Sequence, residues 1–274
     1  MHRRSGIGSI AFAAALCVVT SGARGADDLK YPDLRSQWVR LGGGHFDPTL
    51  GRSGLSKPPY TDEYRAIAEA DQAKAGGEQP TAKCIPPGIP RGMLVIEPME
   101  IIVTPEITYV ELSYFSELRR IYTDGRDWPQ SIQPSFTGYS IGKWEDVDGD
   151  GRMDVLTIET RGPFRGPRVF EGGLPLHRDN QTIVKERIYL DKDNPDILYD
   201  EITTIDHALS QPWTVKRSYK RERASNWIEF VCNEDNHYVT IGDETYFLSS
   251  DRHLMPMRKD QPPPDLRNFN DAAK

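Results

Sequence analysis

The chain has 274 residues, of which 37% are hydrophobic and 27% charged, with 23 Gly, 21 Pro and a formal net charge of −7. This composition excludes a multi-pass membrane protein, a coiled coil, a collagen-like fibre and a wholly disordered acidic tail. The sequence pI of about 5.5 also argues against nucleic acid as a partner, because a protein that neutralises phosphates needs a basic surface.

The first 25 residues have the features of an export signal. A positive start at residues 2–4 precedes an apolar run, residues 7–19, that is too short to span a bilayer. Small residues at Ala23 and Gly25 predict cleavage after Gly25. We therefore expect a periplasmic or secreted protein with no integral membrane segment in the mature chain. An uncleaved N-terminal anchor is the alternative.

Two cysteines remain once Cys17 leaves with the signal. In an oxidising compartment we expect Cys84 and Cys232 to form a disulfide. Such a bond closes a loop of about 150 residues and stabilises the fold by about 4 kcal/mol in the chain-entropy account. Two separate buried thiols are the alternative.

After the signal, residues 26–93 are expected to form an irregular N-terminal arm that carries one helix, at about residues 61–75. Thr61 is a suitable N-cap, and Gly76 and Gly77 end the helical pattern. Pro-rich chain then leads into the more regular part of the sequence.

Residues 94–250 predict a mainly β domain, because short β-branched and aromatic runs alternate with turn residues. The expected strands are 101–103, 108–115, 118–123, 155–160, 182–190, 197–205, 213–220, 227–231, 238–241 and 245–248. With little helix between them, these strands favour an antiparallel meander that forms a lipocalin-like barrel or a sandwich. The Pro-rich tail, residues 251–274, is expected to be extended or disordered.

Several sequence blocks occur together in one order. They are Cys84-x-Pro86-x-Gly88, Arg119-Arg120-Ile121-Tyr122-Thr123-Asp124-Gly125-Arg126, Gly138-x-Ser140-Ile141-Gly142-x-Trp144 and Glu186-Arg187. In these blocks the chain resembles a group of exported bacterial β-rich proteins with no established activity, over about residues 80–220. The group commonly has a short Gly-Asp turn after the Trp, whereas this chain has a longer acidic loop. The resemblance therefore implies export and a β fold and little about chemistry.

That acidic loop, residues 146–154, is similar to the start of a calcium-binding loop, in which alternating carboxylates face one ion and a glycine permits the sharp turn. The expected ligands are Asp146, Asp148, Asp150, Asp154 and the backbone carbonyl of Arg152. The acidic residue at the twelfth position is missing, since Thr157 stands there, and the flanks are expected to be strands. We interpret the loop as a structural Ca²⁺ site, with a solvated acidic turn as the alternative.

Strand alternation places charged side chains on apolar faces, where an ion needs a partner or a ligand. Glu186 shares its face with Val184 and Ile188, and Arg217 shares its face with Trp213, Val215 and Tyr219. We therefore hypothesise a polar, ligand-binding cluster inside the barrel. Its expected members are Arg120, Tyr122, Glu186, Trp213, Arg217 and Tyr219. A satisfied internal salt bridge without a ligand is the alternative.

The histidines offer weaker signals. His207 follows Asp206, and a turn there would let the two side chains meet, so His207 and His177 are candidate acid or base groups. No two histidines show the spacing that directs two imidazoles to one metal from a single helix or strand, which argues against zinc. Nothing in the sequence indicates a nucleotide or haem site.

These observations favour an exported protein that binds a small, partly apolar molecule inside a β-barrel. One alternative is a cofactor-free lyase, isomerase or hydrolase, with catalytic candidates Glu186, Arg217, His207 and His177. Another is an envelope protein that acts through protein contacts. The sequence leaves the oligomeric state open.

Overall fold

A computed structural model describes residues 30–42, 58–73 and 80–224, and parts of the chain between residues 227 and 267. The expected export signal lies outside the described residues. Within the described part, none of the helices is both long enough and apolar enough to cross a membrane.

Nine strands form a closed barrel in which β9 pairs back to β1. The barrel strands are β1 (Gln37–Arg40), β2 (Met99–Val103), β3 (Ile107–Leu112), β4 (Glu117–Tyr122), β5 (Tyr139–Glu145), β6 (Val155–Arg161), β7 (Ile183–Leu190), β8 (Ile197–Ile205) and β9 (Trp213–Glu222). The structure therefore confirms the mainly β fold and decides for a barrel over a sandwich. One detail differs from the meander, because β4 and β5 are parallel. The long connection, residues 123–138, makes this pairing geometrically accessible.

The barrel closes through β1, in the arm that the sequence predicted to be irregular. Trp38 of β1 pairs with Arg221 of β9 on one side and with Met99 of β2 on the other. Its indole is fully buried and donates a hydrogen bond to the Leu34 carbonyl oxygen, at 2.9 Å. Four residues are too few to show a β alternation in the sequence, so only the tertiary pairing identifies this strand.

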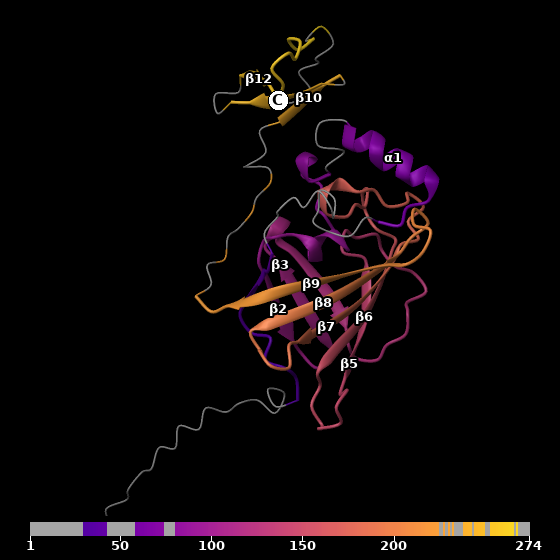
Figure 1. The fold of residues 1–274 in the computed structure, drawn as a ribbon, viewed down its shortest axis with the longest axis vertical. Coiled ribbons are helices and arrows are strands. Elements are labelled where there is room, and N and C mark those ends of the chain that lie inside the picture. Colours follow the sequence, from indigo (N-terminus) through magenta and orange to yellow (C-terminus); the bar gives the residue numbers. More distant parts are fainter. Residues whose placement is uncertain are drawn as a thin grey trace, which may run out of the picture.

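The expected helix is present as α1 (Asp62–Ala73) and lies at one end of the barrel (Figure 1). Thr61 caps it, since its hydroxyl oxygen accepts the Tyr64 backbone N–H at 3.3 Å. Tyr64 and Ala68 are buried against the barrel. The short 3₁₀ helices are η2 (Pro80–Lys83), η3 (Arg91–Leu94), η4 (Tyr114–Ser116) and η5 (Glu171–Gly173).

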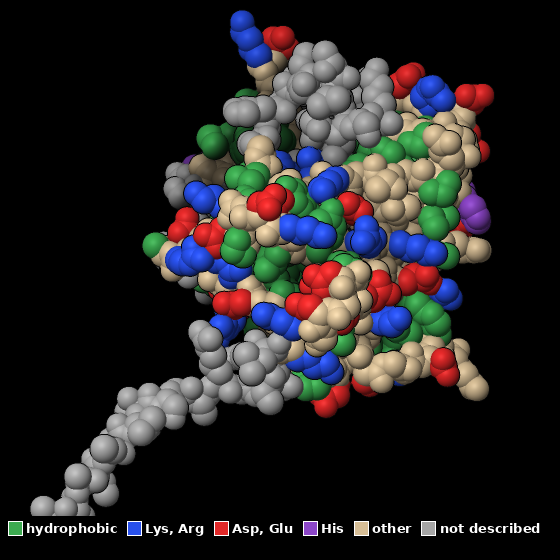
Figure 2. All heavy atoms as spheres, turned by 60° about the horizontal axis from the view of Figure 1, so that its bottom comes forward, with side chains coloured by type: hydrophobic (Ala, Val, Ile, Leu, Met, Phe, Trp, Pro, Cys, Tyr) green, Lys and Arg blue, Asp and Glu red, His purple; other side chains and the backbone are tan. Residues whose placement is uncertain are grey.

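Side chains alternate between a filled interior and a charged outer wall. Every second residue of β8 is buried, and Leu156, Ile188 and Ile202 are at most 1% exposed. Burying a side chain of this size stabilises the fold by about 2 kcal/mol. On the outside, Figure 2 shows Lys and Arg side chains interspersed with Asp and Glu rather than gathered by sign. This face therefore lacks the basic stripe that a nucleic-acid backbone requires.

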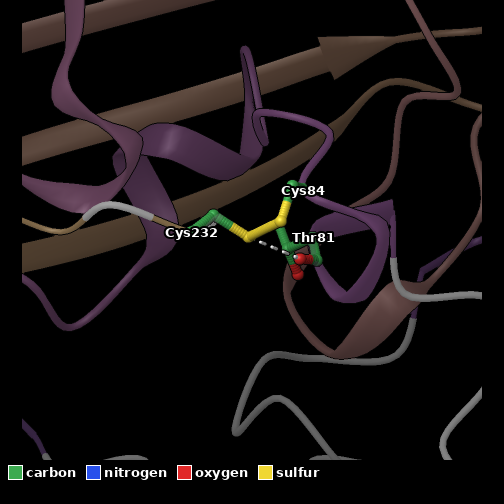
Figure 3. Close-up of a disulfide and its surroundings, with 3 residues drawn as sticks. All are labelled: Thr81, Cys84 and Cys232. Atoms are coloured by element: carbon green, nitrogen blue, oxygen red, sulfur yellow. Dashed lines mark hydrogen bonds between the residues drawn. A yellow bond between two sulfur atoms is a disulfide. The ribbon is translucent and has the colours of Figure 1, made fainter. Parts of the chain in front are cut away.

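A disulfide joins the region before β2 to the C-terminal part of the chain (Figure 3). Cys84 and Cys232 are 148 residues apart in sequence, with Cα atoms 5.5 Å apart, and the Thr81 carbonyl oxygen lies 3.7 Å from the Cys232 sulfur. The structure thus confirms the expected pairing.

Beyond the barrel, a separate three-stranded sheet consists of β10 (Tyr238–Ile241), β11 (Glu244–Leu248) and β12 (Leu254–Pro256). The strands expected over 238–241 and 245–248 thus belong to this second sheet, and residues 254–256 of the expected tail form a strand. The strand expected over 227–231 lies largely outside the described residues.

Candidate functional site

Glu186 faces the barrel interior, as the sequence predicts, and its partner is Arg119. Two hydrogen bonds of 2.9 and 2.5 Å join the Arg119 guanidinium to the two carboxylate oxygens of Glu186, and both side chains are fully buried. The guanidinium also donates to the hydroxyl oxygens of Ser140 and Thr160, at 3.3 and 2.7 Å. A bidentate pair with hydroxyl acceptors around it satisfies both charges without a ligand, which favours a structural role for Glu186.

Arg217 also lies on the interior face of β9, as expected, but its cross-strand neighbour is Asp200 of β8. Asp200 is fully buried, and neither carboxylate oxygen has a hydrogen-bond partner. Burial, together with the negative charge of Glu186, raises the pKa of Asp200 well above its usual range. This environment favours the protonated carboxyl group, and Asp200 is a member of the interior cluster that the sequence analysis missed.

The placement of Arg120 inside the barrel is wrong. Arg120 is exposed on the outer wall, and Arg119 and Ile121 are the interior residues of β4. The sequence pattern predicts the two faces of β4 the wrong way round, because the apolar Leu118 resembles a core residue. In the structure 41% of Leu118 is exposed. Tyr122 shares the outer face and stacks on Tyr139, with a ring separation of 4.9 Å.

The remaining members of the expected ligand set are inside. Trp213 packs edge-on against Phe170 with ring centroids 4.5 Å apart. Tyr219 is 3% exposed, and its hydroxyl donates to the Met93 carbonyl oxygen at 2.5 Å. Both side chains are thus held by protein groups, so they contribute to a packed core around Glu186 and Arg217.

A cavity of about 780 Å³ lies between α1 and the segment 166–180, which connects β6 to β7. Its walls combine apolar and charged side chains. They include Ile67, Leu176, Val169, Glu63, Asp71, Arg178 and His177. This volume lies within the range of small-molecule sites.

His177 and His207 meet at this end of the barrel, where both imidazoles approach the Asp179 carboxylate and their ring centroids lie 5.7 Å apart. The Asp179 Oδ2 atom lies 3.0 Å from His177 Nδ1 and 2.5 Å from His207 Nδ1. Burial alone would raise the pKa of Asp179, but hydrogen bonds from His207, the Gln181 backbone N–H and His177 together lower it to about 2. The Asp179 carboxylate between the two imidazoles therefore carries its negative charge throughout the physiological pH range.

Asp206 does not orient His207, contrary to the expectation from their adjacency. Its Oδ1 atom accepts the backbone N–H groups of His177 and Ala208 at 2.8 and 2.9 Å, and its Oδ2 accepts the Thr182 hydroxyl at 2.6 Å. Asp206 is 7% exposed. It thus fastens together the two chain segments that carry the histidines.

Arg168 extends this buried network. Its guanidinium donates to the Thr182 hydroxyl oxygen at 2.9 Å, to Asn180 Oδ1 at 2.8 Å and to the His177 carbonyl oxygen at 2.6 Å. These contacts fix the backbone on both sides of Asp179. The spacing argument against a metal considered single helices and strands, and it does not apply here because the histidines come from two different loops.

At the other end of the barrel, the acidic loop between β5 and β6 collects three of its expected ligands. Three carboxylate oxygens lie within 4.8 Å of one another, one each from Asp146, Asp148 and Asp154. This exposed group could hold a metal ion. Asp150 is not part of this group of carboxylates, and it instead accepts the Arg152 backbone N–H at 2.8 Å. The Arg152 backbone carbonyl stays a predicted ligand.

Comparison of the chain with models of known protein families and with curated proteins gave no match.

Proposed function

We propose that this protein is exported and binds a small, partly apolar molecule in the cavity between α1 and the segment 166–180. The observation that carries the proposal is the cavity itself, whose volume of about 780 Å³ and mixed walls suit a ligand with an apolar body and a polar end. The Cys84–Cys232 disulfide supports export, because such bonds persist in oxidising compartments.

This location differs from the barrel interior suggested by the sequence. The interior charges of Glu186 and Arg119 satisfy each other, and the aliphatic side chains around them are closely packed. The end cavity instead borders the His177 imidazole, whose side chain is 32% exposed. A ligand can reach that imidazole without opening the barrel wall.

The cavity is tested with 1-anilinonaphthalene-8-sulfonate, a small amphipathic fluorescent probe. Ile67 lines the cavity from α1 and is 36% exposed, so Ile67→Trp fills space without disturbing the core. We expect this variant to weaken probe binding at least about tenfold, since a ligand cannot overlap the new ring. Unchanged binding in Ile67→Trp would contradict the proposal. Ile96→Trp is the matched control, because Ile96 is 53% exposed and does not line this cavity.

A smaller part of the proposal concerns the acidic loop. The convergence of Asp146, Asp148 and Asp154 supports a weak structural Ca²⁺ site that joins the ends of β5 and β6. Extracellular calcium modules of this kind bind at about 0.1 to 1 mM. The ion would stabilise the hairpin and take no part in ligand binding, since α1, which borders the cavity, lies at the opposite end of the barrel from the loop between β5 and β6 (Figure 1).

A further inference from the structure

The strongest unassigned feature is the group formed by His177, Asp179 and His207. One nitrogen of each imidazole and one carboxylate oxygen lie within 4.8 Å of one another. Two imidazoles and one carboxylate form a ligand set that first-row transition metals prefer, whereas Ca²⁺ and Mg²⁺ prefer oxygen alone. We propose that His177, Asp179 and His207 bind a divalent transition-metal ion such as Zn²⁺, independently of the small molecule in the cavity.

The distances fit such an ion with little movement. In a tetrahedral zinc site with bonds of about 2.1 Å, ligand atoms are separated by about 3.4 Å. The separations from Asp179 Oδ2 to the two Nδ1 atoms are 3.0 and 2.5 Å. Shifts of less than about 1 Å would therefore let an ion enter between the three atoms. The His207 side chain is 65% exposed, so this histidine can adjust freely.

The supporting contacts resemble those of a preorganised metal site. The second carboxylate oxygen of Asp179 accepts the Gln181 backbone N–H at 3.1 Å, which turns Oδ2 toward the histidines. The ring of His177 packs on Tyr64 of α1, with centroids 5.1 Å apart. Behind them, Asp206 fixes the backbone of both histidine segments. Outer contacts of this kind orient metal ligands and are needed for tight binding.

Without a metal, the same arrangement is held by protons. The ionised Asp179 carboxylate can only accept, so His207 donates its Nδ1 proton to Oδ2. At His177, the Asp179 backbone N–H donates to Nδ1 at a distance of 3.2 Å, so this nitrogen presents a lone pair. That lone pair is the one that a metal ion would take.

The ion would have three protein ligands, which leaves at least one position for water or another ligand. His177 also lines the cavity of about 780 Å³, so the ion would lie at the edge of that cavity. The ligand class that can reach it comprises molecules with a carboxylate, hydroxyl or other metal-binding donor.

The test is titration of the full chain, stripped with a chelator, with Co²⁺ and then Zn²⁺. We expect one equivalent of Co²⁺ to give the visible absorption of a nitrogen-ligated ion, and Zn²⁺ to displace it. His207→Ala and Asp179→Asn each alter a proposed ligand and should weaken affinity at least about tenfold, since even the loss of an outer contact costs about 10- to 100-fold. Circular dichroism of both variants checks that they remain folded.

Two matched variants separate this site from other metal-binding groups. His253→Ala removes an exposed histidine of the C-terminal region, and Asp148→Asn alters the acidic loop. Both should bind Co²⁺ like the unaltered chain. The proposal is overturned if the unaltered chain shows no saturable Co²⁺ binding, if His207→Ala binds equally well, or if Asp148→Asn abolishes the signal. Because Ile67→Trp tests the cavity separately, failure of one proposal is distinguishable from failure of the other.

Discussion

The two ends of the barrel gather charged side chains in opposite ways. At the α1 end, the buried Asp206 joins the residues after β8 to the connection between β6 and β7, and the buried Arg168 braces that connection. At the other end, Asp146 is exposed and accepts N–H groups from its own loop, at Gly149 and Gly151. The first arrangement is set by the tertiary fold before any ligand arrives, whereas the second is a local turn. The comparison predicts large effects at the first end and small ones at the second.

The largest loss of stability is expected in the barrel interior, between the two ends. It gives the reference value for removing one partner of a buried ion pair. Glu186→Ala leaves the Arg119 guanidinium unpaired in the interior and should lower the free energy of unfolding by about 4 to 5 kcal/mol. Urea denaturation measures it. Glu201→Ala, on the outer face of β8, is the matched control and should cost below about 1 kcal/mol. Equal losses would mean that the interior pair contributes no more than a surface pair.

Asp206 provides the test at the α1 end. Asp206→Ala removes the acceptor of three donors, from His177, Ala208 and Thr182, and should cost about 3 to 4 kcal/mol. The same variant should weaken Co²⁺ binding, because the histidine segments lose their common anchor. A loss below about 1 kcal/mol in urea denaturation would show that the network is not what holds this end together.

Glu117 is a buried carboxyl group that differs from Asp206 in having few donors around it. The hydrogen bond found for it comes from the Gly88 backbone N–H, at 3.1 Å. Burial raises its pKa from 4.5 to about 7, although the Gly88 N–H opposes the shift. The folded state therefore binds more protons than the unfolded state between these values. Stability should fall by about 2 to 3 kcal/mol as the pH rises from about 4.5 to 7.

Glu117→Gln tests this directly, since the amide does not titrate. Denaturation midpoints measured across that pH range should decline less in the variant than in the unaltered chain, and the variant should be the more stable of the two at pH 8. A pH profile that is the same for both proteins would refute the assignment to Glu117.

The smallest effect is expected at the acidic loop. Asp154→Ala should cost below about 1 kcal/mol without calcium, because the lost hydrogen bond, to the Val147 N–H, is exposed. Calcium at about 5 mM should stabilise the unaltered chain by about 1 to 2 kcal/mol, given a dissociation constant of about 0.1 to 1 mM. Thermal unfolding with and without calcium measures this gain. A similar gain in Asp154→Ala would place the ion elsewhere.

The sequence predicted the parts that depend on local patterns. Alternation identified Glu186, Trp213, Arg217 and Tyr219 as interior residues, and capping residues identified α1. It failed at Arg119, because Leu118 and Tyr122 suggested the opposite phase for β4. It also missed Asp200, although Leu198 and Ile202 flank this residue on one face. The same alternation rule, applied to β8, would have found it.

The sequence alone thus determined that the chain forms a mainly β fold with one helix, and which cysteines form the disulfide. The tertiary structure decided that the sheet closes through β1 and that Arg119 is the partner of Glu186. It also brought His177, Asp179 and His207 together. The reason is physical: alternation and capping act over a few residues, whereas the closing strand, the ion pair and the histidine group join residues separated by tens of positions or more.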